Sequence, residues 1–132
     1  MPEKTSFDYA VIRVVPRVDR AEFMNAGVIL FARTVRFLEA RISLDRARLL
    51  SLFPKADISE IEHHLTGIPK ICAGEKDSGP IGALPQHERW HWLVAPRSTI
   101  IQTSETHSGI CDDPATALDR LMQSLVLHSI SE

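Results

Sequence analysis

Cysteine and long apolar runs are both scarce in this sequence of 132 residues. Its two cysteines, Cys72 and Cys111, are too few for a disulfide scaffold. No run approaches the roughly 18 consecutive apolar residues that a transmembrane helix needs, so we expect no membrane span. Residues 1–8 are polar and of mixed charge, unlike a secretory signal peptide. We therefore expect a soluble, cytoplasmic protein.

A surplus of charge is also missing, because fifteen basic residues face seventeen acidic ones for a formal net charge of −2. The total charge therefore does not favour an anionic membrane or nucleic acid as the partner. Glycine shows no cofactor signature either. Gly74, Gly79 and Gly82 are spaced neither as a P-loop nor as a dinucleotide-binding loop, and we expect no cofactor.

The basic residues that are present lie unevenly along the chain. Seven of the eleven arginines fall within the first 46 residues, namely Arg13, Arg17, Arg20, Arg33, Arg36, Arg41 and Arg46. We expect most of them to be exposed and paired with nearby acids, which are Asp19, Glu22, Glu39 and Asp45. A guanidinium also suits a carboxylate or phosphate, which leaves an anion site, a partner-protein surface or a nucleic-acid-binding module as alternatives.

The first third of the chain predicts a three-stranded antiparallel meander. Residues 9–15 are apolar and rich in β-branched side chains, which is typical of a strand covered on both faces, and residues 26–32 predict a second apolar strand. Gly27 indicates a bulge or a close backbone approach. Residues 37–44 alternate between apolar and polar side chains, as in a half-exposed strand.

The rest of the chain predicts three helices and one further strand. The helices are expected over residues 46–53, from a cap at Asp57 to an end or kink at Gly67 and Pro69, and after a cap at Asp112 or Asp113. Residues 98–103 predict the strand, 104–109 a polar turn, and 88–94 fit either a helix or a strand. The sum is a single α+β domain over residues 1–132, with its core at about 9–127 and helices on one face of a small, mainly antiparallel sheet.

Residues 87–91 read His-Glu-Arg-Trp-His, the H-E-x-x-H pattern of zinc peptidases. On a helix, His87 and His91 can share a zinc ion while Glu88 polarises its water, with a third ligand from His107 or Glu105. On a strand the two histidines lie about 13 Å apart, too far for one metal. We treat a small zinc-dependent hydrolase as an alternative, and ordinary partly buried histidines as the leading interpretation.

Two weaker candidate sites involve other histidines and the cysteines. Glu60 lies three and four residues before His63 and His64, which places all three on one helix surface, yet solvent-exposed histidines are the simpler interpretation. Cys111 precedes a helix N-terminus, which could lower the pKa of its thiol. We nevertheless expect both cysteines to be small buried thiols.

The most polar segment of the chain covers residues 97–109. It gathers donors and acceptors around two isoleucines, among them Arg97, Ser98, Thr99, Gln102 and His107. One interpretation is that these groups satisfy loop backbone and a helix cap. The other is a site for an anion or for the backbone of a partner, with Arg97 as its charged fork.

Three segments resemble a bacterial family, the domain-of-unknown-function family 3037. They are YAVIRVVPRVDRAEFMNAGVILF at 9–31, WHWLVAPRSTIIQTSETHSG at 90–109 and CDDP at 111–114, and the resemblance covers about residues 9–127. It assigns no reaction and implies a partner or regulator of a HipA-like kinase. The positions of the family pattern are Asn25, Gly27, Phe31, His91, Trp92, Pro96, Arg97, Ser98, Thr99, Gln102, His107 and Gly109. His87 departs from that pattern, which lowers the weight of the zinc motif.

These observations favour a non-catalytic binding or regulatory module. The expected site consists of Arg97, Ser98, Thr99, Gln102 and His107, with Asn25 near them. The expected partner is another protein, and the resemblance suggests a HipA-like kinase; a small anion and a second copy of the chain are further candidates.

Overall fold

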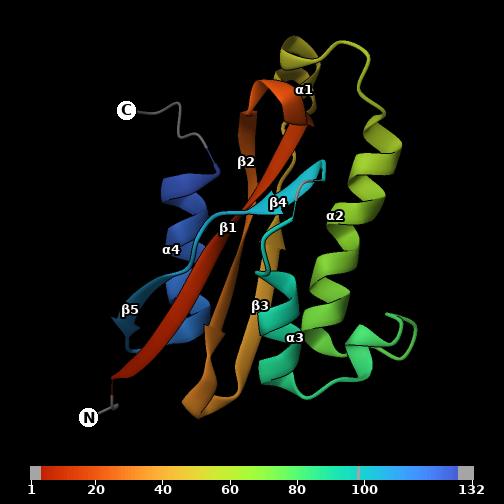
Figure 1. Cartoon of the computed structure of the whole chain (residues 1–132). Coiled ribbons are helices and arrows are strands. Elements are labelled where there is room, and N and C mark those ends of the chain that lie inside the picture. Colours follow the sequence, from red (N-terminus) through yellow and green to blue (C-terminus); the bar gives the residue numbers. More distant parts are fainter. Residues whose placement is uncertain (1–3, 98, 128–132) are drawn as a thin grey trace.

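A five-stranded antiparallel sheet forms the centre of the protein, whose computed structural model describes residues 4–97 and 99–127 (Figure 1). Strands β1 (Thr5–Arg17), β2 (Glu22–Ala32) and β3 (Phe37–Ile42) form the predicted N-terminal meander. The strand order is β3-β2-β1-β4, and β4 (Ile101–Thr103) and β5 (His107–Cys111) both pair with the far edge of β1. The predicted α+β fold is thereby confirmed.

Short 3₁₀ turns connect the meander strands. They are η1 (Val18–Arg20) and η2 (Arg33–Val35), and each ends on a residue in the left-handed region, Ala21 and Arg36, with φ of 55°. A third turn, η3 (Ile81–Ala83), lies in the glycine-containing loop of residues 74–85.

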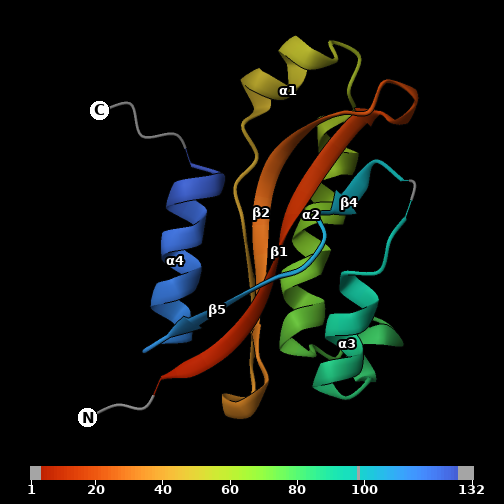
Figure 2. The same cartoon turned by 60° about the vertical axis from the view of Figure 1, so that its left-hand side comes forward.

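Helices cover both faces of the sheet (Figure 2). Helices α2 (Ile58–Ala73) and α3 (Gln86–Leu93) pack on one face, where α1 (Arg46–Leu52) also contributes Leu49 to the core. Helix α4 (Pro114–Leu125) packs on the other face, over Val28, Leu30 and Ala32 of β2. The expectation of helices on one face is wrong because β1 and β2 are apolar on both sides, so two layers are needed to bury them.

Gly27 marks both the bulge and the close approach that its position suggests. The β1–β2 register shifts between Ile12 and Arg13. A Cβ at Gly27 would overlap the carbonyl oxygen of Arg41 on β3. The shift changes which residues of β2 face α4, and it brings Asn25 opposite Arg13.

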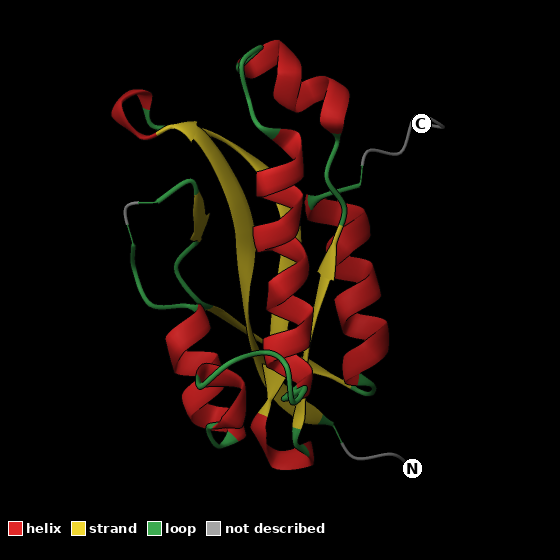
Figure 3. Cartoon of the chain, turned by 90° about the vertical axis from the view of Figure 1, so that its right-hand side faces the viewer, coloured by secondary structure: helices red, strands yellow, loops and turns green. Residues whose placement is uncertain are grey.

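Of the end or kink expected at Gly67 and Pro69, the end is wrong, because helix α2 continues through both residues (Figure 3). Ile61 and Leu65 before the proline and Cys72 after it are buried on the same side of the helix. This packing outweighs the one backbone bond that proline removes. The helix ends at Gly74, whose φ of 67° is typical of a glycine cap.

The structure also tests the predictions for two further segments. Residues 88–94 belong mainly to α3, which begins directly after Pro85, so the helical alternative holds. The predicted polar turn at 104–109 is wrong in its second half, because residues from His107 onward pair with β1 as β5. No described helix has both the length and the apolar character needed to cross a membrane.

Candidate functional site

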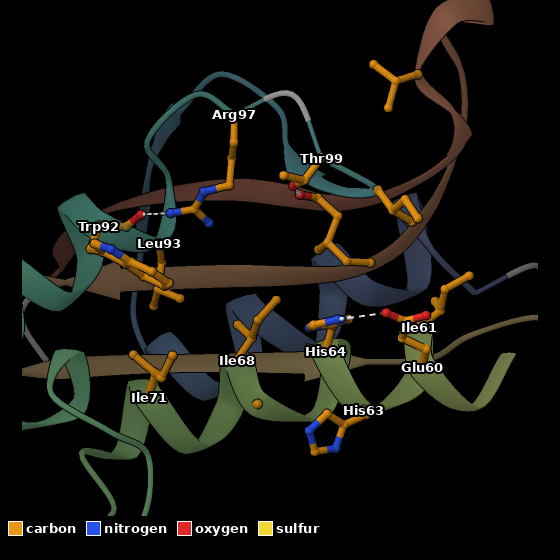
Figure 4. Close-up of a pocket in the computed structure, with 14 residues that line it drawn as sticks. Glu60, Ile61, His63, His64, Ile68, Ile71, Trp92, Leu93, Arg97 and Thr99 are labelled. Carbon is orange, nitrogen blue, oxygen red and sulfur yellow. Dashed lines mark hydrogen bonds and ion pairs between the residues drawn. The ribbon is translucent and has the colours of Figure 1, made fainter. Parts of the chain in front are cut away.

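A cavity of about 750 Å³ lies between α2, α3 and the segment leading into β4 (Figure 4). We call it the α2–α3 cavity. Its walls are mainly apolar, with Ile61, Ile68 and Ile71 from α2 and Leu93 from α3. Ile100 and Ile101 supply the opposite wall. A largely apolar hollow with a few polar groups is the usual form of a binding pocket.

Arg97 provides the positive charge of this cavity. Its guanidinium lies over the indole ring of Trp92, 4.4 Å from the ring centroid, and donates a hydrogen bond to the Trp92 carbonyl (Figure 4). Among the described residues, Arg97 has no acidic partner. A guanidinium that is positioned but not neutralised can receive a carboxylate from outside.

The wall of the cavity that α2 forms carries a second group of polar side chains. Glu60, His63 and His64 all line the cavity, and His64 Nε2 lies 3.8 Å from a carboxylate oxygen of Glu60. The structure thus brings two separately predicted candidates, the Arg97 segment and the Glu60–His64 group, to one hollow. Within residues 4–97 and 99–127, no three histidine, cysteine or acidic side chains are grouped as a metal site would require.

Apolar side chains at the edge of the cavity are open to solvent. Val18, Trp92 and Ile100 line it and are exposed by 45%, 40% and 43%. Exposed apolar surface that continues into a hollow is typical of an interaction site rather than of a sealed core defect.

The predicted site residues separate into three locations. Arg97 and Thr99 line the cavity, and Ser98 lies outside the described residues. Thr99 also organises its own loop, since its hydroxyl donates to the carbonyl of Ile101 at 2.8 Å. Gln102 and Asn25 lie elsewhere, both opposite Arg13 on neighbouring strands.

His107 does not join the other predicted residues. It lies on β5, directly opposite Tyr9, and its ring is 5.3 Å from the ring of Tyr9. Tyr9 packs with the cluster under α4, whereas the α2–α3 cavity lies on the other face of the sheet. The expectation of one site containing both Arg97 and His107 is therefore wrong, because β4 and β5 pair with different halves of β1.

The N-terminal arginines are mostly paired as expected. Arg17 pairs with Asp19, Arg20 with Glu22, and Arg41 with both Glu39 and Asp119. Arg46 pairs with Glu62, while Asp45 caps α1 by accepting from the Arg48 backbone amide. These pairs neutralise much of the basic cluster and weaken the nucleic-acid alternative.

The H-E-x-x-H residues do lie on a helix, as zinc binding would require. His87, Glu88 and His91 are exposed on α3, and none of them lines the α2–α3 cavity. The proposed third ligands lie beyond β4, with His107 on β5 and Glu105 just before it. The structure does not group these residues into a three-ligand site within its described part.

The apolar walls of the cavity could not be predicted from the sequence. Ile68, Ile71 and Leu93 read as ordinary core positions, and the exposed apolar residues Val18 and Ile100 lie far apart along the chain. The available signal was Trp92, an aromatic residue five positions before an arginine that it then holds. Only the tertiary arrangement shows that these side chains surround one space.

A family described as protein of unknown function (DUF3037) matches residues 9–126 of the chain. No curated protein and no solved structure matches it.

Proposed function

We propose that this chain, which belongs to the DUF3037 family, is a binding module that holds a segment of a partner protein in the α2–α3 cavity. The observation that carries the proposal is the combination of an apolar hollow with a positioned, unneutralised guanidinium at Arg97. Apolar area supplies affinity on binding, and one charged contact fixes the orientation.

The chemistry of the cavity indicates what the partner segment carries. Isoleucines on facing walls suit apolar side chains at helical or extended spacing. Arg97 has no acid of its own among the described residues, so the segment supplies a carboxylate there. Glu60 on the other wall lies beside His64 and repels a second acid.

A protein partner suits this cavity because its apolar surface extends outward. Val18, Trp92 and Ile100 would meet side chains that flank the inserted segment. The family resemblance makes a HipA-like kinase the partner to test first, and a regulatory role follows if the bound segment belongs to such a kinase.

Site-specific crosslinking in the native host tests the proposal. A photoreactive phenylalanine analogue at position 100 is expected to capture one dominant protein through an apolar segment with an acidic residue. The same analogue at Val35, which is 51% exposed on η2, serves as the control position. Arg97→Ala is expected to reduce capture at position 100 strongly without changing the thermal midpoint of unfolding.

Several results would contradict the proposal. One is capture of no protein at position 100, or of the same proteins at positions 100 and 35. Another is unchanged capture in the Arg97→Ala variant. Capture of a partner other than a HipA-like kinase would reject the kinase assignment while leaving the binding module in place.

A further inference from the structure

On the face of the sheet that α4 covers, a row of polar residues lies beside the C-terminal end of α4. Arg13 on β1 lies directly opposite Asn25 on β2 and opposite Gln102 on β4. Directly opposed residues of antiparallel strands share a face, so we call these three residues the Arg13 row. Asn25 Nδ2 donates to the carbonyl of Leu125 at 2.9 Å, which fixes the row beside the last turn of α4.

Among the described residues, the guanidinium of Arg13 has no acidic partner. It is half-buried, and its Nε is covered and has no hydrogen-bond partner. Its side chain contacts Phe23, whose ring centroid lies 4.1 Å from the guanidinium carbon. The neighbouring Arg17 and Arg20, in contrast, each pair with an acid. A guanidinium taken partly out of water without an acceptor destabilises the fold until an oxyanion meets it.

The side chain of Asn25 has a buried acceptor that lacks a donor within the described part of the chain. Its Nδ2 donates to the Leu125 carbonyl, whereas its Oδ1 is buried and accepts no hydrogen bond from the residues that the structure describes. An acceptor so placed calls for an N–H or O–H donor. The C-terminal end of α4 lies at the same point, and the partial negative charge of a helix C-terminus favours a cation there.

We infer that the Arg13 row, with Phe23, is a second binding site, which takes a free α-amino acid with an apolar side chain. The carboxylate meets the guanidinium of Arg13, and the ammonium group donates to Asn25 Oδ1 beside the end of α4. Phe23 is 47% exposed and stacks on Arg13, so its ring moves aside to admit the ligand and then contacts the apolar side chain. This site is independent of the α2–α3 cavity, which lies on the other face of the sheet.

Titration of the protein with L-leucine, followed by backbone amide NMR, tests the inference. We expect the signals of Arg13, Asn25 and Gln102 to shift and to saturate at millimolar ligand. Leucinamide lacks the carboxylate and N-acetyl-L-leucine lacks the ammonium group, so each is expected to bind about tenfold more weakly or worse.

Variants assign the effect to the row. Arg13→Met removes the charge and is expected to abolish binding, whereas Arg17→Met on the same strand, where the arginine is already paired with Asp19, leaves it unchanged. Gln102→Glu places a carboxylate on β4 opposite Arg13, in place of the amide that donates to the Thr99 carbonyl, and is expected to abolish binding. This second variant keeps the test valid if Arg13→Met fails to fold.

The outcomes are distinct. Absence of any shift with L-leucine would overturn the site, as would binding that survives in Gln102→Glu. Equal affinity for N-acetyl-L-leucine would overturn the amino-acid assignment, because a carboxylate alone would then suffice.

Discussion

The guanidinium of Arg97 is held from two directions by a single residue, Trp92. The indole ring lies 4.4 Å beneath it and the Trp92 carbonyl accepts one of its hydrogen bonds. This arrangement uses the planar shape of arginine, because one face stacks and one edge donates. The remaining donors of Arg97 are thereby set at the edge of the α2–α3 cavity.

Arg97→Lys tests whether this planar arrangement matters beyond the charge. Lysine keeps the positive charge but loses the stacked fork, so we expect crosslinking at position 100 to fall toward the level of Arg97→Ala. The free energy of unfolding is expected to change by less than about 0.5 kcal/mol, because Arg97 makes no buried ion pair. Capture that is equal to that of the unchanged protein would show that the charge alone recruits the partner.

The sheet was predictable to the extent that it depends on local pattern. The apolar runs at 9–15 and 26–32 and the alternation at 37–44 predict β1, β2 and β3 correctly, because local pattern and burial agree there. The course of α2 beyond Pro69 was not predictable, since it depends on the burial of Cys72 against other elements.

The candidate site was predictable only in part. The polarity of the segment around Arg97 indicated one wall of the cavity, and Glu60 with His64 indicated another. That these two groups line the same cavity follows from the tertiary packing of α2 against the segment that leads into β4. Arg13 read as one of several surface arginines, because only the pairing of the strands places Asn25 and Gln102 beside it.

Gly27→Ala is expected to destabilise the sheet strongly. The added Cβ would meet the carbonyl oxygen of Arg41, a backbone atom that cannot move without separating β2 from β3. We expect the free energy of unfolding to fall by about 2 kcal/mol or more, measured by urea denaturation.

Gly67→Ala is the matched control for that variant. Gly67 lies inside α2 with nothing within 4 Å of the position of a Cβ. Alanine there should raise the free energy of unfolding by about 0.5–1 kcal/mol. Destabilisation by both variants to the same degree would contradict the backbone overlap at Gly27.

Ser104 lies between β4 and β5 in the chain, and its side chain takes the place of a ladder bond to β1. Its hydroxyl oxygen accepts from the Val11 amide at 2.9 Å, its own amide donates to the Val11 carbonyl at 2.8 Å, and the side chain is buried. Ser104→Ala leaves the Val11 N–H buried without a partner and should cost about 1–3 kcal/mol in denaturant unfolding. Ser51→Ala on the exposed α1 is the control, and equal effects of the two would contradict the role of the hydroxyl.

Asp113 links the stability of α4 to pH. The hydroxyl and backbone amide of Thr116 donate to its carboxylate and hold its pKa below the usual value. Because the folded pKa is lowered, this stabilisation is fully present above the unfolded pKa of about 4 and is lost as pH falls through the folded pKa. We expect Asp113→Asn to melt at a lower temperature than the unchanged protein near pH 7, with the difference disappearing in acid. A constant difference across the pH range would contradict the charged cap.

The two cysteines should react very differently with a thiol reagent. Burial raises the pKa of Cys72 to about 12, so its thiolate is scarce and covered at pH 8. Cys111 is half-buried, and partial burial together with Asp113 and Asp112 raises the pKa of its thiol. With Ellman's reagent at pH 8 we expect a single slow reaction in the native protein, faster as pH rises and absent in Cys111→Ser. Rapid modification of both thiols without denaturant would show that α2 opens from the sheet in the native state.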